Sequence, residues 1–135
     1  MRNMILSYFV VLAVFLAIDF VWLSTMGKVF YAAELGSLMR DKPLLGVAFL
    51  FYALFAFGLY VFVVQPNAAA GISARIIFLG GLFGLVAYAT YDLTNLSTMR
   101  GFSSRVAIVD MVWGTLLSTG VTVISIRLIQ MLKLL

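Results

Sequence analysis

Three of the chain's five acidic residues, Asp19, Asp92 and Asp110, lie inside or at the end of long hydrophobic segments. A carboxylate in hydrocarbon costs about 2.5 to 3.5 kcal/mol on insertion scales, so each one needs a partner or a function. Two of the three begin the same four-residue pattern, D-x-V-W, at residues 19–22 and 110–113. Carboxyl groups in this setting can bind a polar group, exchange protons or, as a pair that shares one proton, activate water. The sequence therefore predicts a polar site within the membrane, near one of its faces.

Helical spacing places aromatic and polar side chains beside these carboxylates. Residues three or four apart share a helix face, so each D-x-V-W pattern sets a tryptophan one turn after its aspartate. A tyrosine and an asparagine flank Asp92 in the same way, and arginines of the adjoining loop are candidate partners for the negative charge. The predicted binding residues are Asp19, Trp22, Tyr88, Asp92, Asn95, Arg100, Arg105, Asp110 and Trp113.

A purely structural interpretation is the alternative for each of these residues. A shallow aspartate can pair with an arginine or cap a neighbouring helix, and Trp22 and Trp113 can serve as anchors at the membrane–water interface. Three carboxylates that fall near the same membrane face favour a shared polar site over this alternative, because ionisable groups within a membrane are functional by default.

The elements that must position these residues follow from composition. The chain has 135 residues, of which 64% are hydrophobic and 10% are charged, too apolar for a soluble domain of this size. Long uncharged runs without alternation predict helices, since helices satisfy their own backbone polar groups in lipid. The fold class is therefore all-α, a four-helix transmembrane bundle in one integral membrane domain, 1–135. The expected spans are about 4–24, 43–64, 72–93 and 105–127. Both termini then lie on one side, and the nine basic residues divide too evenly between the two sides to give an orientation.

Local signals predict where several helices begin and end. Residues 24–28 end the first span, with Gly27 as a C-terminal cap, and residues 29–39 form a short amphipathic helix at the interface. Asp41-Lys42-Pro43 predicts the start of the second helix, and Ser103-Ser104 caps the fourth. Gly80 and Gly84, four residues apart in the third span, predict close packing against a neighbouring helix.

Several function classes are excluded by what the chain lacks. It has no cysteine and no histidine, which excludes disulfides, thiolate zinc sites and His-ligated haem or di-iron centres. We therefore expect no cofactor and no metal. The basic residues stand singly at segment ends, so no nucleic-acid partner is expected. Acid–base chemistry would fall to Asp, Glu, Lys, Tyr or water, and no residue is assigned a catalytic role, so the sequence favours a protein that is not an enzyme.

Three segments carry a family resemblance: residues 19–23, 91–98 and 110–114. They resemble the DUF2177 family of small bacterial membrane proteins with four predicted spans, and the resemblance covers essentially the whole chain. It implies a multi-pass protein of the bacterial inner membrane, and the family's function is unknown. Members occur near fatty-acid-modifying genes, which favours a role with lipids.

The first functional hypothesis is a lipid- or amphiphile-binding protein whose carboxylates form a polar site at one membrane face, with membrane lipid as a partner. A second is a proton-coupled small-molecule transporter similar to the small multidrug resistance family, in which a homodimer would follow. A third is an intramembrane aspartyl hydrolase, and a structural subunit of a membrane complex is the fourth. The ligand and the oligomeric state stay open at this point.

Overall fold

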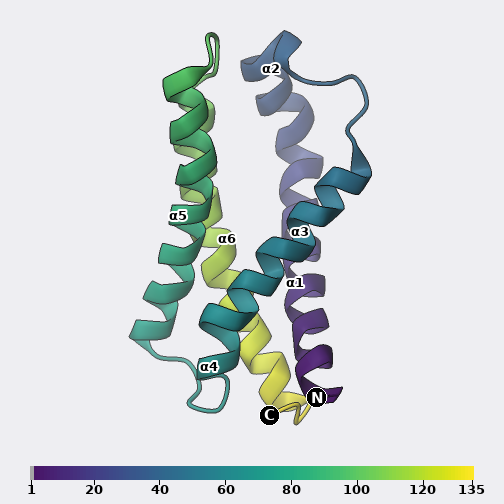
Figure 1. Cartoon of the computed structure of the whole chain (residues 1–135), viewed down its shortest axis with the longest axis vertical. Coiled ribbons are helices and arrows are strands. Elements are labelled where there is room, and N and C mark those ends of the chain that lie inside the picture. The colour runs from purple at the N-terminus through teal and green to yellow at the C-terminus, as the bar shows by residue number, and fades with distance from the viewer. Residues whose placement is uncertain (1) are drawn as a thin grey trace.

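Four long helical segments run side by side in the computed structural model, which describes residues 2–135 (Figure 1). All four are long and apolar enough to cross a membrane: Arg2–Leu38, Leu45–Asn67, Ala74–Thr98 and Ser104–Met131. No strand occurs among the described residues, which confirms the all-α transmembrane bundle. The two termini lie at one end of the molecule, and the connections after the first and third segments lie at the other (Figure 1).

Short irregular helices extend two of these segments. The first consists of α1 (Arg2–Met26), the π-helical turn η1 (Gly27–Tyr31), α2 (Ala32–Leu35) and the 3₁₀ turn η2 (Gly36–Leu38). The second consists of α3 (Leu45–Leu59), the π-helical turn η3 (Tyr60–Val64) and α4 (Gln65–Asn67). The third and fourth are the uninterrupted helices α5 (Ala74–Thr98) and α6 (Ser104–Met131).

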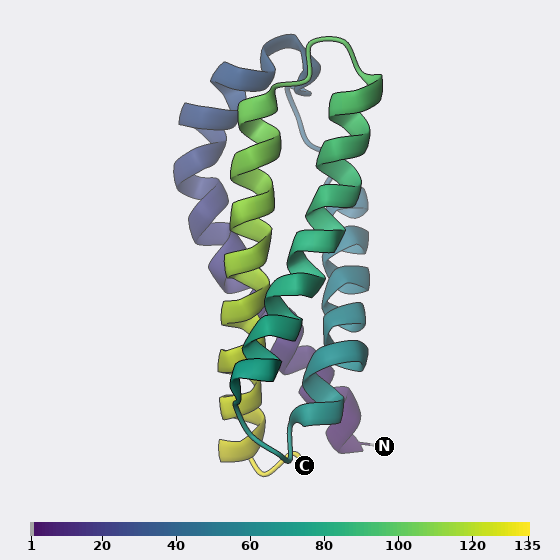
Figure 2. The same ribbon diagram turned by 90° about the vertical axis from the view of Figure 1, so that its left-hand side faces the viewer.

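Glycines bring α5 and α6 into close contact. A Cβ atom at Gly84 would overlap the carbonyl oxygen of Gly114, and one at Gly80 would lie 2.6 Å from the Thr122 hydroxyl oxygen. The expected close approach at Gly80 and Gly84 is therefore confirmed. Figure 2 shows the two helices adjacent along most of their length. Asp92 lies on α5 and Asp110 lies on α6, so this close packing brings together the helices that hold the two aspartates.

Substitution of Gly84 by alanine is expected to destabilise the protein by about 1 to 3 kcal/mol, because the new methyl group forces the two backbones apart. The matched control is Gly120→Ala in α6, where an added Cβ has no neighbour within 4 Å. Unfolding in mixed micelles with a denaturing detergent measures the difference. Equal stability of the two variants would contradict the close packing.

The first membrane helix does not end where the sequence indicated. Gly27 is not a C-terminal cap, because the backbone stays helical and the Ala32 N–H donates to the Gly27 carbonyl, closing a π-turn. The α-helix ends instead at Gly36, whose φ of +50° is accessible mainly to glycine, and a 3₁₀ turn follows to Leu38. Packing explains the extension, since Tyr31 and Leu35 lie against a small buried cluster around Phe102. Tertiary contacts thus override the local stop signal.

The start of the second helix also differs from the prediction. Helix α3 begins at Leu45, and its N-cap residue, Leu44, makes no side-chain capping bond. Asp41 lies too far upstream to cap it, so that expectation was wrong. The Ser103 cap is confirmed, because its hydroxyl accepts a hydrogen bond from the Val106 N–H at 3.4 Å.

Helix α3 packs against α1 and diverges from α5. Phe15 of α1 stacks on Phe55 at a centroid distance of 4.8 Å and meets Tyr52 edge-on at 5.4 Å. In Figure 1 α3 crosses in front of α1, and the distance between α3 and α5 grows toward the end that carries α2. The side chains between α3 and α5 therefore decide whether a cavity exists there.

Candidate functional site

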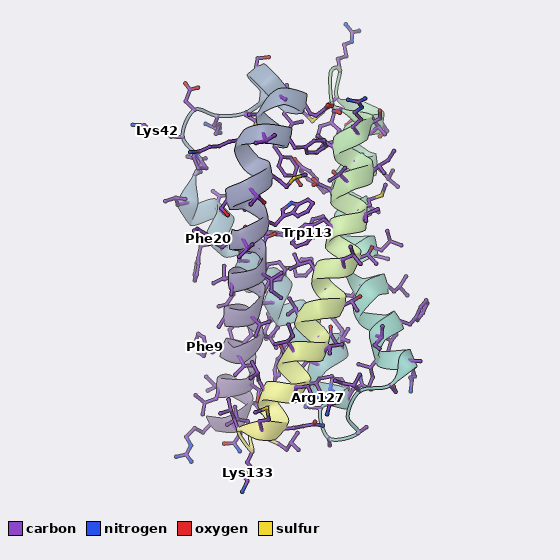
Figure 3. All side chains as sticks on the ribbon, turned by 180° about the vertical axis from the view of Figure 1, so that it is seen from behind. Phe9, Phe20, Lys42, Trp113, Arg127 and Lys133 are labelled. Atoms are coloured by element: carbon purple, nitrogen blue, oxygen red, sulfur yellow. The ribbon has the colours of Figure 1, made fainter. Side chains whose placement is uncertain are left out.

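The two tryptophans of the chain stack on each other across the bundle. The rings of Trp22 from α1 and Trp113 from α6 lie 4.1 Å apart between centroids and are tilted by only 7°. Figure 3 shows Trp113 between the ribbons of these two helices. The tryptophan that ends one D-x-V-W pattern therefore stacks on the tryptophan that ends the other. This contact fixes the register of α1 against α6.

The aspartates of the two patterns are linked to the tryptophans crosswise. Trp113 Nε1 donates to Asp19 Oδ1 at 2.9 Å. Trp22 Nε1 donates to the Tyr31 hydroxyl oxygen at 3.1 Å, and that hydroxyl in turn donates to Asp110 Oδ1. Each aspartate is thus joined to the tryptophan of the other pattern, directly in one case and through a tyrosine in the other.

Asp19 is a fully satisfied acceptor. Its second oxygen, Oδ2, accepts a hydrogen bond from the Tyr52 hydroxyl at 2.6 Å, and the residue is 5% exposed. One donor therefore serves each carboxylate oxygen, which lowers the cost of holding the charge away from water. This arrangement connects α1, α3 and α6 through one side chain.

Asp92 has the opposite environment. It is fully buried, at 0% exposure, and neither of its oxygens has a hydrogen-bond donor. The carboxyl group of Asp110, on the adjacent helix α6, is its nearest acidic neighbour. Two ionised carboxylates can only accept, so a hydrogen bond between them forms only when one of the two carries a proton. The two carboxyl groups therefore lack a hydrogen-bond donor, which a proton or a bound ligand would have to supply.

The two arginines near the connection between α5 and α6 do not supply that donor. Arg105 forms an ion pair with Glu34 at 3.3 Å, and Ser103 Oγ donates to the same glutamate at 2.6 Å. Arg100 is exposed in the turn before α6. No other ion pair occurs within residues 2–135, so none of the three membrane aspartates is paired with a basic side chain there.

A cavity of about 360 Å³ opens beside the Asp92–Asp110 pair, between α3 and α5. Its walls are almost entirely apolar or aromatic, and Asp110 supplies the one charged group. The lining residues are Phe51, Phe55, Ala87, Tyr88, Tyr91 and Asp110. Asn95, one turn beyond Asp92, is half-buried and is not part of this lining.

The rim of the cavity faces outward from the bundle. Phe51 and Tyr91 are 46% and 57% exposed, and they belong to α3 and α5, the two helices that flank the opening. The geometry therefore offers a route from the outer surface of the bundle, past aromatic walls, to a carboxyl group.

Two tyrosines of this network could not be identified from the sequence. Tyr52 is one of two tyrosines in an uncharged span, a pattern that ordinary packing explains equally well. Tyr31 reaches Asp110 only because the helix continues past Gly27. Within residues 2–135 no three metal-ligating side chains converge closely enough to hold a metal ion.

Comparison with known proteins identifies a family. A protein-family model described as "Predicted membrane protein (DUF2177)" matches residues 4–127. No curated protein and no solved structure matched the chain.

Proposed function

The chain belongs to the DUF2177 family of predicted membrane proteins, and we propose that it binds an amphiphile in the cavity between α3 and α5. The headgroup lies at Asp110, and the apolar tail lies along Phe51 and Phe55 toward the lipid. Residence in the bacterial inner membrane is part of this proposal. The observation that carries it is a ligand-sized apolar cavity with one carboxyl group, that of Asp110, in its wall.

The size and chemistry of the cavity support this function. Small-molecule sites commonly occupy about 300 to 1,000 Å³ and combine apolar walls with a few polar groups that orient the ligand. A volume of about 360 Å³ accommodates a headgroup with part of an alkyl chain, and the rest of the chain extends into the bilayer. A second groove, between α1 and α3, is of similar size, but no charged residue lines it, so it offers nothing to select a headgroup.

One observation favours a second candidate function, proton-coupled transport. The Asp92–Asp110 pair can take up and release a proton in a buried position, which is the elementary requirement of such a transporter. Transport also requires access from both membrane faces, whereas the cavity described here opens toward the lipid near α3 and α5. Binding is therefore the function that the geometry supports better.

Filling the cavity tests the proposal. Ala87→Phe places a ring inside the cavity and is expected to abolish binding of a chain-brominated dodecyl amphiphile to the detergent-solubilised protein. Trp22 and Trp113 are the only tryptophans, so quenching of their emission by the bromine reports binding near the network. The control, Ala13→Phe, adds the same ring at an exposed position of α1 and should bind like the native protein. Unchanged saturable quenching in Ala87→Phe would refute the proposed cavity.

A further inference from the structure

A missing hydrogen-bond donor next to the cavity indicates which headgroup fits: Asp110 lines the cavity, and both oxygens of the neighbouring Asp92 are without a donor. We propose that the ligand is a cationic amphiphile, and that its ammonium group replaces a proton shared by Asp92 and Asp110. This inference deepens the proposed function and rests on it. It specifies both the chemical class of the ligand and what leaves the site when the ligand enters.

The first step concerns hydrogen-bonding capacity. Both oxygens of Asp92 are buried without a donor, and the hydroxyl of Tyr31 serves only Oδ1 of Asp110. An ammonium group offers three N–H donors and no acceptor, so it can serve both carboxyl groups at once. A neutral hydroxyl offers one donor, and a carboxylate or phosphate headgroup without a proton offers none. The ammonium group is therefore the best complement.

The second step concerns charge. The titratable groups near the pair are Asp19 from α1, Tyr31 from η1, and Tyr88 and Tyr91 from α5. None of them is a cation, and the single ion pair within residues 2–135, Arg105–Glu34, joins the first turn of α6 to α2. An anionic headgroup would meet several acidic groups and no basic one. A cationic headgroup would supply the positive charge that the site lacks.

The third step concerns the walls. Phe51, Phe55, Tyr88 and Tyr91 line the approach to Asp110. Aromatic faces attract organic cations by about 0.5 to 2 kcal/mol, with the larger values where water is excluded. A carboxyl pair surrounded by aromatic rings thus combines the two features that recognise an ammonium group on an alkyl chain.

Exchange for a proton keeps the charge of the site constant. In the empty protein one proton joins the two carboxyl groups; when the ammonium group enters, that proton leaves to solvent and no covalent bond changes. Binding that releases one proton strengthens by up to about tenfold per pH unit. Affinity should therefore rise with pH while the empty pair still holds its shared proton, and it should level off once that proton has left the empty protein.

The experiment compares dodecylamine, dodecanol and dodecanoate, each brominated on the chain, by quenching of the tryptophan emission at about pH 6 and about pH 8. We expect dodecylamine to bind tightest and to gain up to roughly a hundredfold in affinity between these pH values. Dodecanol should bind more weakly, with no pH dependence. Asp92→Asn should remove both the preference for the amine and its pH dependence, whereas Asp41→Asn, at an exposed loop position, should change neither.

The outcomes separate this inference from the proposed function. If dodecanol or dodecanoate binds as tightly as dodecylamine, and Ala87→Phe still abolishes that binding, the ammonium inference is wrong and the amphiphile site stands. If none of the three binds, the proposed function fails as well. Dodecylamine binding that does not change with pH would overturn the proton exchange. The comparisons among the three ligands and between the two pH values need only the native protein, so they hold even if Asp92→Asn does not fold.

Discussion

Replacement of Asp19 by leucine is expected to destabilise the protein by about 2 to 4 kcal/mol. The substitution removes the acceptor for two donors, Trp113 Nε1 and the Tyr52 hydroxyl, which lie within the bundle. A buried donor left without an acceptor costs about 1 to 3 kcal/mol, and both donors here are only half-buried, which favours the lower part of the summed range. Unfolding in mixed micelles, followed by circular dichroism, measures the loss.

A combined variant isolates the cause. In Asp19→Leu/Tyr52→Phe/Trp113→Phe the two donors are removed together with their acceptor, so no polar group is left without a partner. We expect this triple variant to be more stable than Asp19→Leu alone, although it carries two further substitutions. If the triple variant were less stable than the single one, the hydrogen bonds at Asp19 would not be the reason for the loss.

The four helices could be predicted from the sequence because the membrane imposes a strong and simple constraint. An uncharged run of about twenty residues must satisfy its backbone hydrogen bonds internally, and only a helix does so within one segment. The glycine pair at Gly80 and Gly84 could be predicted for the same reason: its effect depends on spacing within one helix. The end of the first segment depends on contacts with Phe102, distant in sequence, and local signals therefore misplaced it.

The candidate site shows the same division between local and tertiary information. The spacing of each D-x-V-W pattern sets a tryptophan next to an aspartate on one helix. The structure adds a hydrogen bond from Trp113 to Asp19, the aspartate of the other pattern, which depends on the register between α1 and α6. Arg105 was a candidate partner for the membrane carboxylates, but Glu34 of the extended first segment binds it. A single sequence contains no signal for which acid an arginine will reach.

Asp92 and Asp19 should respond in opposite ways to substitution. Asp92→Asn is expected to give a protein at least as stable as the native one, with a gain of up to about 1 to 3 kcal/mol, because a buried acid without a donor is replaced by an amide. The amide N–H can donate a hydrogen bond to Asp110, so a shared proton is no longer needed to join the two side chains. The gain should be largest at alkaline pH, where the native pair loses its shared proton, and smallest at acid pH.

The same variant should lose selective binding of dodecylamine, because the site has lost one of its two carboxyl groups. A substitution that stabilises a protein and removes its ligand identifies a residue retained for function and not for folding. Unfolding measured across the pH range, together with the quenching titration, tests both halves of this expectation. A marked loss of stability in Asp92→Asn at every pH would mean that Asp92 supports the packing of α5 on α6. The structural explanation of the membrane carboxylates would then be the better one for this residue.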